Sequence, residues 1–183
     1  KRFMGVELYG KTLGIVGLGR IGTEVARRAL SFEMKVVAYD PYLSMDRAKQ
    51  LGVELADLEG VFRRSDFITL HTPLTDDTRH IIGEKEIGLM KKGVRIINCA
   101  RGGIVDEDAL IKGIESGKVA AAALDVYEKE PPKGSKLLAL DRVVLTPHLG
   151  ASTEEAQTNV AIDVANTIRD ALLQRGVRNA VNF

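Results

Sequence analysis

The stretch TLGIVGLGRIGTEVARRALSFEMKVVAYD, from Thr12 to Asp40, decides the fold. An apolar run over residues 12–18 leads into the glycine-rich turn GLGRIG, and residues 21–32 then carry apolar side chains at helical spacing. A second apolar run, Lys35–Tyr39, ends at an acidic residue and a proline, and Met45–Leu51 can form a short helix behind it. The order strand, tight turn, helix, strand predicts a βαβ unit.

The glycines of this turn have the spacing of a dinucleotide-binding site. A GxGxxG pattern alone is weak evidence, but here Gly17 ends a strand, Gly22 lies in the first helical turn, and Asp40 ends the next strand at close to the expected interval of about 20 residues. Gly17 allows the tight turn, Gly19 lets the backbone approach a pyrophosphate, and Gly22 lets helix and strand pack closely. Asp40 would bind the adenosine ribose and repel the extra phosphate of NADP, so the sequence predicts NAD as cofactor. The alternative is a structural turn that binds nothing.

The same alternation continues along the chain. Four more strands are predicted at residues 67–71, 94–100, 119–126 and 143–146, separated by helical stretches around Gly60, Glu86 and Leu110. Strands that alternate with helices predict the α/β class, here a doubly wound parallel sheet of the Rossmann type in three layers. Residues 128–135 must form a loop. A long amphipathic helix is predicted over residues 152–174, with Ser152 and Glu155 as a capping box.

Composition narrows the class of protein. The chain has 183 residues, 45% of them hydrophobic and 28% charged, which is typical of one globular domain. Its 26 basic and 25 acidic side chains nearly cancel, so neither nucleic acid nor an anionic membrane is an expected partner, and a small molecule is. The lone cysteine, Cys99, and the lack of a signal-peptide pattern at the start lead us to expect a cytoplasmic protein.

Polar residues follow several predicted strands. Ligands of open α/β sheets bind beyond the carboxyl ends of the strands, so Arg101, Asp125, Glu130 and His148 should meet in one crevice. Oxidising an alcohol with NAD requires a base near neutral pKa, a role for His148, whose imidazolium a nearby carboxylate would stabilise. Arg101 offers a planar fork that matches a carboxylate, which favours a 2-hydroxy or 2-oxo acid as substrate.

Each of these residues also has a simpler interpretation. His148 could merely cap a strand end, and spacing alone does not choose between Glu128 and Glu130 as the carboxylate. We expect His71 to pack near the cofactor and His80, after the polar run TDDTR, to be a solvated surface residue. Cys99 is expected to be structural, because hydride transfer needs no nucleophile. No metal site is predicted.

A longer set of motifs resembles the D-isomer-specific 2-hydroxyacid dehydrogenase family. GKTLGIVGLGRIG, YDPY, LHTPLT, NCARGGIVDEDAL, LDVYEKEPP and TPHLGAST stand in the family's order and cover essentially the whole chain. The resemblance implies that Arg101 binds substrate, that Glu130 rather than Glu128 is the catalytic glutamate, and that His148 is the acid/base. It also implies a set of residues around the cofactor: Gly17, Gly19, Arg20, Ile21, Gly22, Asp40, Thr72, Pro73, Cys99, Ala100, Arg101, Asp125, His148, Gly150 and Ala151.

The resemblance further implies an activity and an assembly. It favours oxidation of 3-phosphoglycerate to 3-phosphohydroxypyruvate, as in serine biosynthesis, over the glyoxylate or hydroxypyruvate reductases and other D-2-hydroxyacid dehydrogenases of the same family. A different class, a NAD-sensing binding module, would need no proton carrier. A homodimer through this domain is implied, with the apolar stripes at residues 105–114 and 160–172 as candidate surfaces or as helices packed within the monomer.

The resemblance also gives an expectation about domain organisation. Residues 1–183 are expected to form the NAD-binding domain, and the substrate domain of this family is expected to be absent from the chain. Because a closed cleft that excludes water then requires the missing domain, we expect the isolated chain to bind NAD but to turn over substrate poorly.

Overall fold

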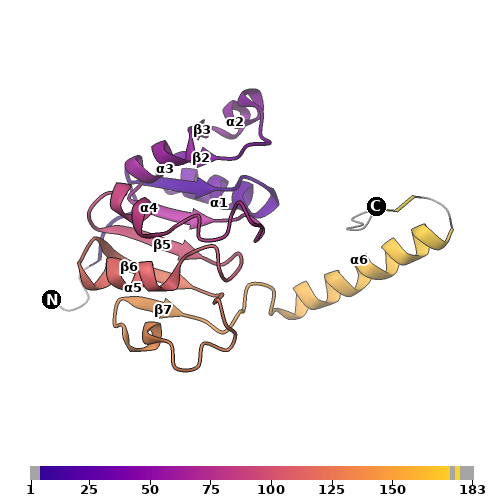
Figure 1. The fold of residues 1–183 in the computed structure, drawn as a ribbon. Helices are drawn as coiled ribbons and strands as arrows, with labels where there is room; N and C mark the ends of the chain where they lie inside the picture. The colour runs from indigo at the N-terminus through magenta and orange to yellow at the C-terminus, as the bar shows by residue number, and fades with distance from the viewer. Residues whose placement is uncertain (1–4, 174–175, 178–183) are drawn as a thin grey trace. The chain divides into compact units, whose positions relative to one another are not determined.

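A seven-stranded parallel sheet forms the centre of the computed structural model, which describes residues 5–173 and 176–177 (Figure 1). The strands are β1 (Thr12–Val16), β2 (Lys35–Tyr39), β3 (Glu54–Leu55), β4 (Phe67–Leu70), β5 (Val94–Asn98), β6 (Val119–Leu124) and β7 (Val143–Leu145). The helices are α1 (Arg20–Ser31), α2 (Met45–Leu51), α3 (Leu58–Arg64), α4 (Glu84–Leu89), α5 (Glu107–Glu115) and α6 (Glu154–Leu172), with a short 3-10 helix, η1 (Lys136–Ala139).

The order of the strands fixes where a ligand can bind. Across the sheet the order is β3-β2-β1-β4-β5-β6-β7, and every strand pair is parallel. After β3 the chain crosses back over β1 and forms β4 on the other side of β1. The connection after β1 therefore runs toward one edge of the sheet, and the connection after β4 runs toward the other edge. A crevice opens at the carboxyl ends of two such strands, and it is the usual ligand site of an open α/β sheet.

Two apolar clusters, one on each face, hold the sheet between its helices. One cluster joins β1 and β2 to α1 through Ile15, Ala26 and Ala29, all of them buried. The larger cluster packs α3, α4 and α5 against the other face, with Ile96 and Leu110 fully buried (Figure 1). Because near-continuous apolar strands are buried on both faces only in a layered α/β protein, the predicted three-layer doubly wound fold is confirmed.

The strand ends and one strand differ from the prediction. β4, β5, β6 and β7 each stop one or two residues earlier than expected, because the chain leaves the ladder where the polar residues of the crevice begin. β3 was not predicted, since its two residues are too short to show a period of two. The predicted loop at residues 128–135 lies between β6 and η1.

The apolar stripe at residues 105–114 lies inside the fold. Val105, Leu110, Ile111 and Ile114 are all at most 7% exposed and belong to the larger cluster. Of the two interpretations offered for this stripe, packing within the monomer is therefore the right one, and the stripe is not a dimer surface.

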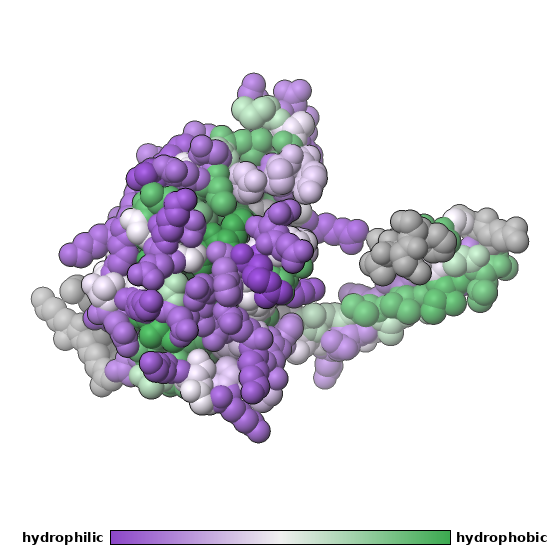
Figure 2. Space-filling view, viewed as in Figure 1, coloured by the Kyte–Doolittle hydropathy of each residue, from purple (hydrophilic) through white to green (hydrophobic). Residues whose placement is uncertain are grey.

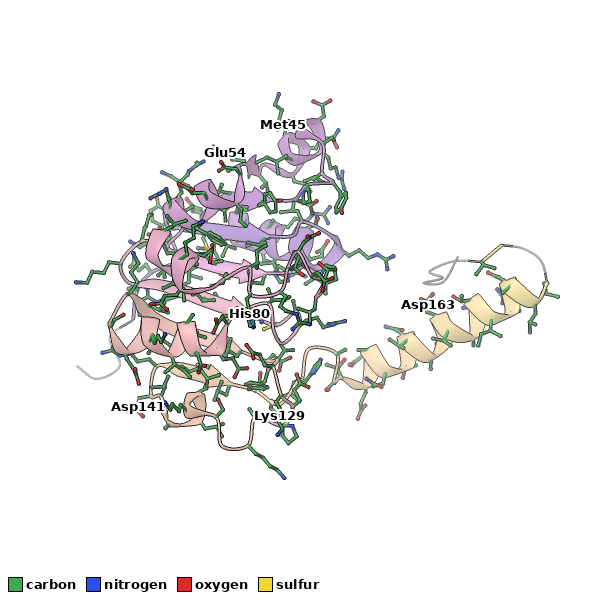
Figure 3. The ribbon with its side chains drawn as sticks, viewed as in Figure 1. Met45, Glu54, His80, Lys129, Asp141 and Asp163 are labelled. Carbon is green, nitrogen blue, oxygen red and sulfur yellow. The ribbon has the colours of Figure 1, made fainter. Side chains whose placement is uncertain are left out.

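The described chain divides into two compact units, Lys1–Pro147 and His148–Phe183. The second unit contains α6, whose apolar side chains are exposed along its length (Figure 2). Its cap is Thr153, whose hydroxyl accepts a hydrogen bond from the Ala156 amide at 3.1 Å, so the predicted Ser152 capping box is wrong by one position. Gln174, the predicted end of this helix, lies outside the described residues.

The first prediction concerns the effect of the close packing at Gly22 on the stability of the fold. A Cβ at position 22 would overlap the carbonyl oxygen of Gly17, which is backbone and cannot move aside. We therefore expect Gly22→Ala to lower the free energy of unfolding by about 2 kcal/mol, measured by thermal and urea denaturation. Gly88→Ala is the matched control, because its Cβ would enter open space on the exposed side of α4. Equal stability of the two variants would contradict the prediction.

Candidate functional site

The glycine-rich turn between β1 and α1 presents bare backbone to the crevice. Gly17 has a φ of 93°, in the left-handed region, and a Cβ there would lie 2.8 Å from the carbonyl oxygen of His71. A Cβ at Gly19, by contrast, would have no described atom within 4 Å. Gly17 is thus required by the fold, whereas nothing in the described fold requires a glycine at position 19.

Asp40 is held by backbone amides at the end of β2. Its two carboxylate oxygens accept hydrogen bonds from the amides of Leu18, at 2.7 Å, and Tyr42, at 2.9 Å. The first of these bonds ties Asp40 to the glycine-rich turn. Each oxygen keeps a second lone pair, so the carboxylate can still accept hydrogen bonds from ribose hydroxyls.

A cleft of ≈ 510 Å³ runs along the carboxyl ends of β1, β2 and β4. It is lined by five residues of the predicted cofactor set, Gly17, Gly19, Asp40, Thr72 and Pro73. His71, expected to pack near the cofactor, also lines the cleft, and seven further lining residues were not predicted, namely Tyr39, Pro41, Tyr42, Thr75, Asp77, Thr78 and Ile81. Their common signal is position: they lie at or just after the end of β2 or in the loop after β4.

The cleft fits a dinucleotide in two respects. The hydroxyl oxygen of Thr72 is buried and has no hydrogen-bond partner among the described residues, so a bound polar group could satisfy it. Arg20 and Ile21, both members of the predicted cofactor set, form the exposed first turn of α1, and no side chain caps that end of the helix. Free amides at a helix N-terminus bind phosphate, so the residues present suit the predicted cofactor.

The loop after β5 carries Cys99, Ala100 and Arg101 and is shaped by a buried amide. Asn98 is 2% exposed, and its side chain accepts a hydrogen bond from the Ala100 amide at 3.0 Å and donates one to the Arg101 carbonyl at 2.9 Å. The sequence analysis did not select Asn98. It positions the backbone from which the exposed side chain of Arg101 projects.

A second polar network joins the ends of β6 and β7. Asp125, only 5% exposed, accepts a 2.6 Å hydrogen bond from the hydroxyl of Thr146. The hydroxyl of Tyr127 donates to the carbonyl of Thr146 at 2.8 Å. These bonds fix the end of β7 two residues before His148, and Tyr127 is a second residue that the sequence analysis did not select.

Two side chains near the crevice have shifted pKa values. Burial lowers the pKa of His71, whose Nε2 lies 3.0 Å from the hydroxyl of Thr69, so this histidine is neutral at pH 7. Cys99 is exposed rather than buried, but partial desolvation and the charge of Asp125 raise the pKa of its thiol. A thiol held in its protonated form is a poor nucleophile, which agrees with the expectation of no chemical role.

The two candidate glutamates follow β6 and have different surroundings. Oε1 of Glu130 accepts a hydrogen bond from the Tyr127 amide at 3.2 Å, so its carboxylate folds back on its own loop. Glu128 instead bonds to His80, on the loop after β4, with 3.0 Å between His80 Nε2 and Glu128 Oε1. His80 is exposed, as predicted, but it is bound to a partner across the surface.

His148, Gly150 and Ala151 belong to the second unit. His148 has a φ of 56°, a conformation that is uncommon for a residue with a side chain and is enriched at functional sites. Gly150 and Ala151 are exposed and precede α6.

The chain is similar to a known family of proteins. Residues 1–150 match the family described as "D-isomer specific 2-hydroxyacid dehydrogenase, NAD binding domain". The chain belongs to this family. The resemblance predicted from the sequence motifs is therefore confirmed, and with it NAD as the cofactor.

Relatives of this dehydrogenase domain match along most or all of the chain. D-3-phosphoglycerate dehydrogenase of Methanocaldococcus jannaschii is 55% identical over 184 residues, which cover 100% of this chain and 35% of that protein. Hydroxypyruvate reductase of Thermotoga maritima is 55% identical over 171 residues, covering 92% of this chain and 55% of the relative. The chain thus spans about a third of the length of the phosphoglycerate dehydrogenases that it matches.

Solved structures agree with the fold. A glyoxylate reductase from Paecilomyes thermophila superposes with a TM-score of 0.91 at 42% identity, over 98% of this chain and 54% of that one. The D-lactate dehydrogenase from Aquifex aeolicus complexed with NAD and lactic acid gives a TM-score of 0.86 at 35% identity, over 95% of this chain and 57% of the other. Both are 2-hydroxyacid enzymes, as the family assignment requires.

Two kinds of feature are absent from the described residues. None of the helices among them combines the length and the apolar composition that a bilayer-spanning segment needs. Nor do three or more of their histidine, cysteine or acidic side chains gather in a way that could hold a metal ion.

The prediction for this site concerns the effect of a side chain at position 19 on the affinity for NAD. Gly19→Ala places a methyl group in the open space of the cleft, where a bound pyrophosphate would approach the turn. We expect NAD to bind at least about tenfold more weakly, while the free energy of unfolding falls by only about 1 kcal/mol, the cost of a poorer helix cap. Titration calorimetry with NAD and thermal denaturation measure the two effects.

The control is a second glycine of the same protein. Gly88→Ala should leave both NAD affinity and the fold intact. If NAD binds Gly19→Ala as tightly as the unchanged protein, the glycine-rich turn does not approach the cofactor.

Proposed function

We propose that this chain is the cofactor domain of a NAD-dependent D-3-phosphoglycerate dehydrogenase, which oxidises 3-phosphoglycerate to 3-phosphohydroxypyruvate. The observation that carries the proposal is the match along 99–100% of this chain, at 53–55% identity, to phosphoglycerate dehydrogenases from two archaea, a cyanobacterium and Bacillus subtilis. A pig phosphoglycerate dehydrogenase is still 48% identical over the whole chain.

Hydroxypyruvate reduction is the second candidate. The relative from Thermotoga maritima is as similar to this chain as the archaeal phosphoglycerate dehydrogenases are. Both reactions interconvert a 2-hydroxy acid and a 2-oxo acid, so the cofactor domain needs the same groups for either. A NAD-sensing module is disfavoured, because a sensor needs neither a substrate-binding arginine nor a proton carrier.

The proposed chemistry assigns each residue one task. The residues of the glycine-rich turn and Asp40 would hold NAD, which would supply the acceptor for the hydride on C2 of the substrate. The guanidinium of Arg101 binds the substrate carboxylate and orients the C2 hydroxyl. The imidazole of His148 takes the proton from that hydroxyl. Glu130 is the catalytic glutamate, whose negative charge would stabilise an imidazolium that has taken up the substrate proton.

We further propose that residues 1–183 serve this enzyme as its NAD-binding domain and that the enzyme is cytoplasmic. Support for the first statement is the family match, and support for the second is the lone Cys99.

The substrate is tested with the full-length enzyme. In the direction of oxidation we expect kcat/KM for 3-phosphoglycerate to exceed the values for glycerate and lactate, and in the direction of reduction we expect that for 3-phosphohydroxypyruvate to exceed the values for hydroxypyruvate and glyoxylate. Each difference should be at least about tenfold, or about 1.4 kcal/mol in transition-state binding. His148→Ala tests the proton carrier in the same enzyme. Hydride transfer should be abolished, while NAD affinity, measured by calorimetry, stays within about twofold of the value for the unchanged enzyme. A preference for hydroxypyruvate would establish the second candidate instead.

A homodimer through α6 is the proposed assembly. Val160, Val164 and Ile168 lie along one side of this helix and are 57%, 53% and 55% exposed. A helix of this length that buries no apolar face is only marginally stable in water. A second copy of the chain would cover such a face, as the family resemblance implies.

Light scattering of the full-length protein tests the assembly. We expect Val164→Glu to convert the dimer to a monomer, because a buried unpaired carboxylate in an apolar interface is strongly unfavourable. Asn159→Glu, on the opposite side of α6, should leave the dimer intact. A dimer that survives Val164→Glu would place the interface elsewhere.

A further inference from the structure

The short segment that carries Glu130, residues 127–130, is tied to the rest of the fold by side chains. Within the segment, the Tyr127 amide binds the Glu130 carboxylate, at 3.2 Å. The next amide along, that of Glu128, donates to Oε1 of Glu107 at 2.8 Å. The orientation of the Glu130 carboxylate therefore depends on where the backbone of residues 127 and 128 is held.

Glu107 provides a rigid anchor for this segment. It is the first residue of α5, whose N-terminus is capped by Asp106 through a 3.0 Å bond from the Ala109 amide. The following residues, Ala109 and Leu110, are buried in the core. The Glu107 amide also lies 3.4 Å from Oε1 of Glu128, so the two glutamates each face the other's backbone amide.

His80 adds a third point of attachment, from a different part of the chain. Its Nε2 lies 3.0 Å from Oε1 of Glu128, and its own amide donates to the carbonyl of Gly103 at 2.8 Å. The loop after β4 that carries His80 also supplies Thr75, Thr78 and Ile81 to the wall of the cofactor cleft. His80 and Glu128 thus connect that wall to the segment of Glu130.

This cluster contains two carboxylates, those of Glu107 and Glu128, whose mutual repulsion must be offset by other contacts. Burial, together with the nearby charge of Glu128, raises the pKa of Glu107, although the bond from the Glu128 amide opposes the shift. Two carboxylates this close repel each other, and the His80 imidazole and the amide end of α5 offset the repulsion. The side chains of His80 and Glu128 are 42% and 40% exposed, and exposed pairs of this kind add only about 0–1 kcal/mol to stability. Their contribution to global stability is too small to be their main effect.

We propose that Glu107, Glu128 and His80 are positioning residues, which hold the segment of residues 127–130 so that the Glu130 carboxylate is correctly placed for catalysis. The inference rests on the proposed function, because it takes Glu130 as the catalytic glutamate. None of the three touches substrate; they act through Glu130. A displacement of about 1 Å in a catalytic group can reduce the rate of reaction by up to about a hundredfold.

The test is a double-mutant cycle in the full-length enzyme, with the best substrate of the panel described above. We expect Glu128→Ala to lower kcat by about tenfold or more, with NAD affinity by calorimetry within about twofold of the unchanged enzyme. In the Glu130→Gln background the same change should lower kcat no further, because residues that act through one group are not additive. Glu128→Gln keeps an oxygen acceptor for His80 and for the Glu107 amide, so it should restore most of the activity.

A second variant protects the test against loss of folding. His80→Asn tolerates the left-handed φ of 52° at this position but cannot reach Glu128, and it should show the same loss and the same dependence on Glu130. Glu84→Ala is the matched control: it removes a glutamate that pairs with Lys112 of α5, at 3.2 Å on the exposed surface, and should leave kcat unchanged.

The outcomes separate this inference from the proposed function. If Glu130→Gln lowers kcat but Glu128→Ala does not, or lowers it equally in both backgrounds, the positioning role is overturned and the proposed function stands. A loss confined to NAD affinity also overturns it. If Glu130→Gln leaves kcat unchanged, the catalytic role of Glu130 fails, and the positioning role fails with it.

Discussion

The close contact between Gly17 and Gly22 is the constraint on which the rest of the molecule depends. Because neither position has room for a side chain, α1 can begin directly at the end of β1 and lie against the sheet. That placement exposes the amides of the first helical turn and the open space at Gly19 to the same crevice. It also brings the amide of Leu18 within reach of Asp40. One backbone contact thus sets the packing of the first layer and the shape of the cofactor cleft together.

The loops after β5 and β6 are organised by buried polar side chains and by a close approach of Gly102, where a Cβ would overlap the backbone carbonyl of Tyr127. Asn98 shapes the loop of Arg101, while Asp125 and Tyr127 fix the end of β7. Each of these groups satisfies a backbone or hydroxyl partner that the end of a strand leaves unpaired. Arg101 is therefore carried by a loop whose conformation the core dictates, and the cluster of Glu107, Glu128 and His80 extends the same arrangement to Glu130.

The fold and the part of the site around the glycine-rich turn could be predicted from the sequence, whereas contacts between distant residues could not. Glycine spacing, apolar runs and Asp40 are local signals, so β1, α1 and β2 could be predicted within one or two residues. β3 was missed because two residues carry no period. The bond between His80 and Glu128 joins residues 48 positions apart, and no local pattern encodes such a contact. Asn98 and Tyr127 were visible as residues at strand ends, but only the three-dimensional structure shows the atoms that they bind.

The double anchoring of Asp40 bears on how readily the cofactor preference of this domain could change. Any route from NAD to NADP must remove the negative charge at position 40, yet the amides of Leu18 and Tyr42 both use that carboxylate as their acceptor. An apolar replacement would leave two donors unpaired and loosen the glycine-rich turn. A short neutral side chain with an oxygen, such as asparagine or serine, would keep an acceptor for at least one amide. Only a few substitutions at position 40 are therefore compatible with a change of preference to NADP, in the laboratory or in evolution.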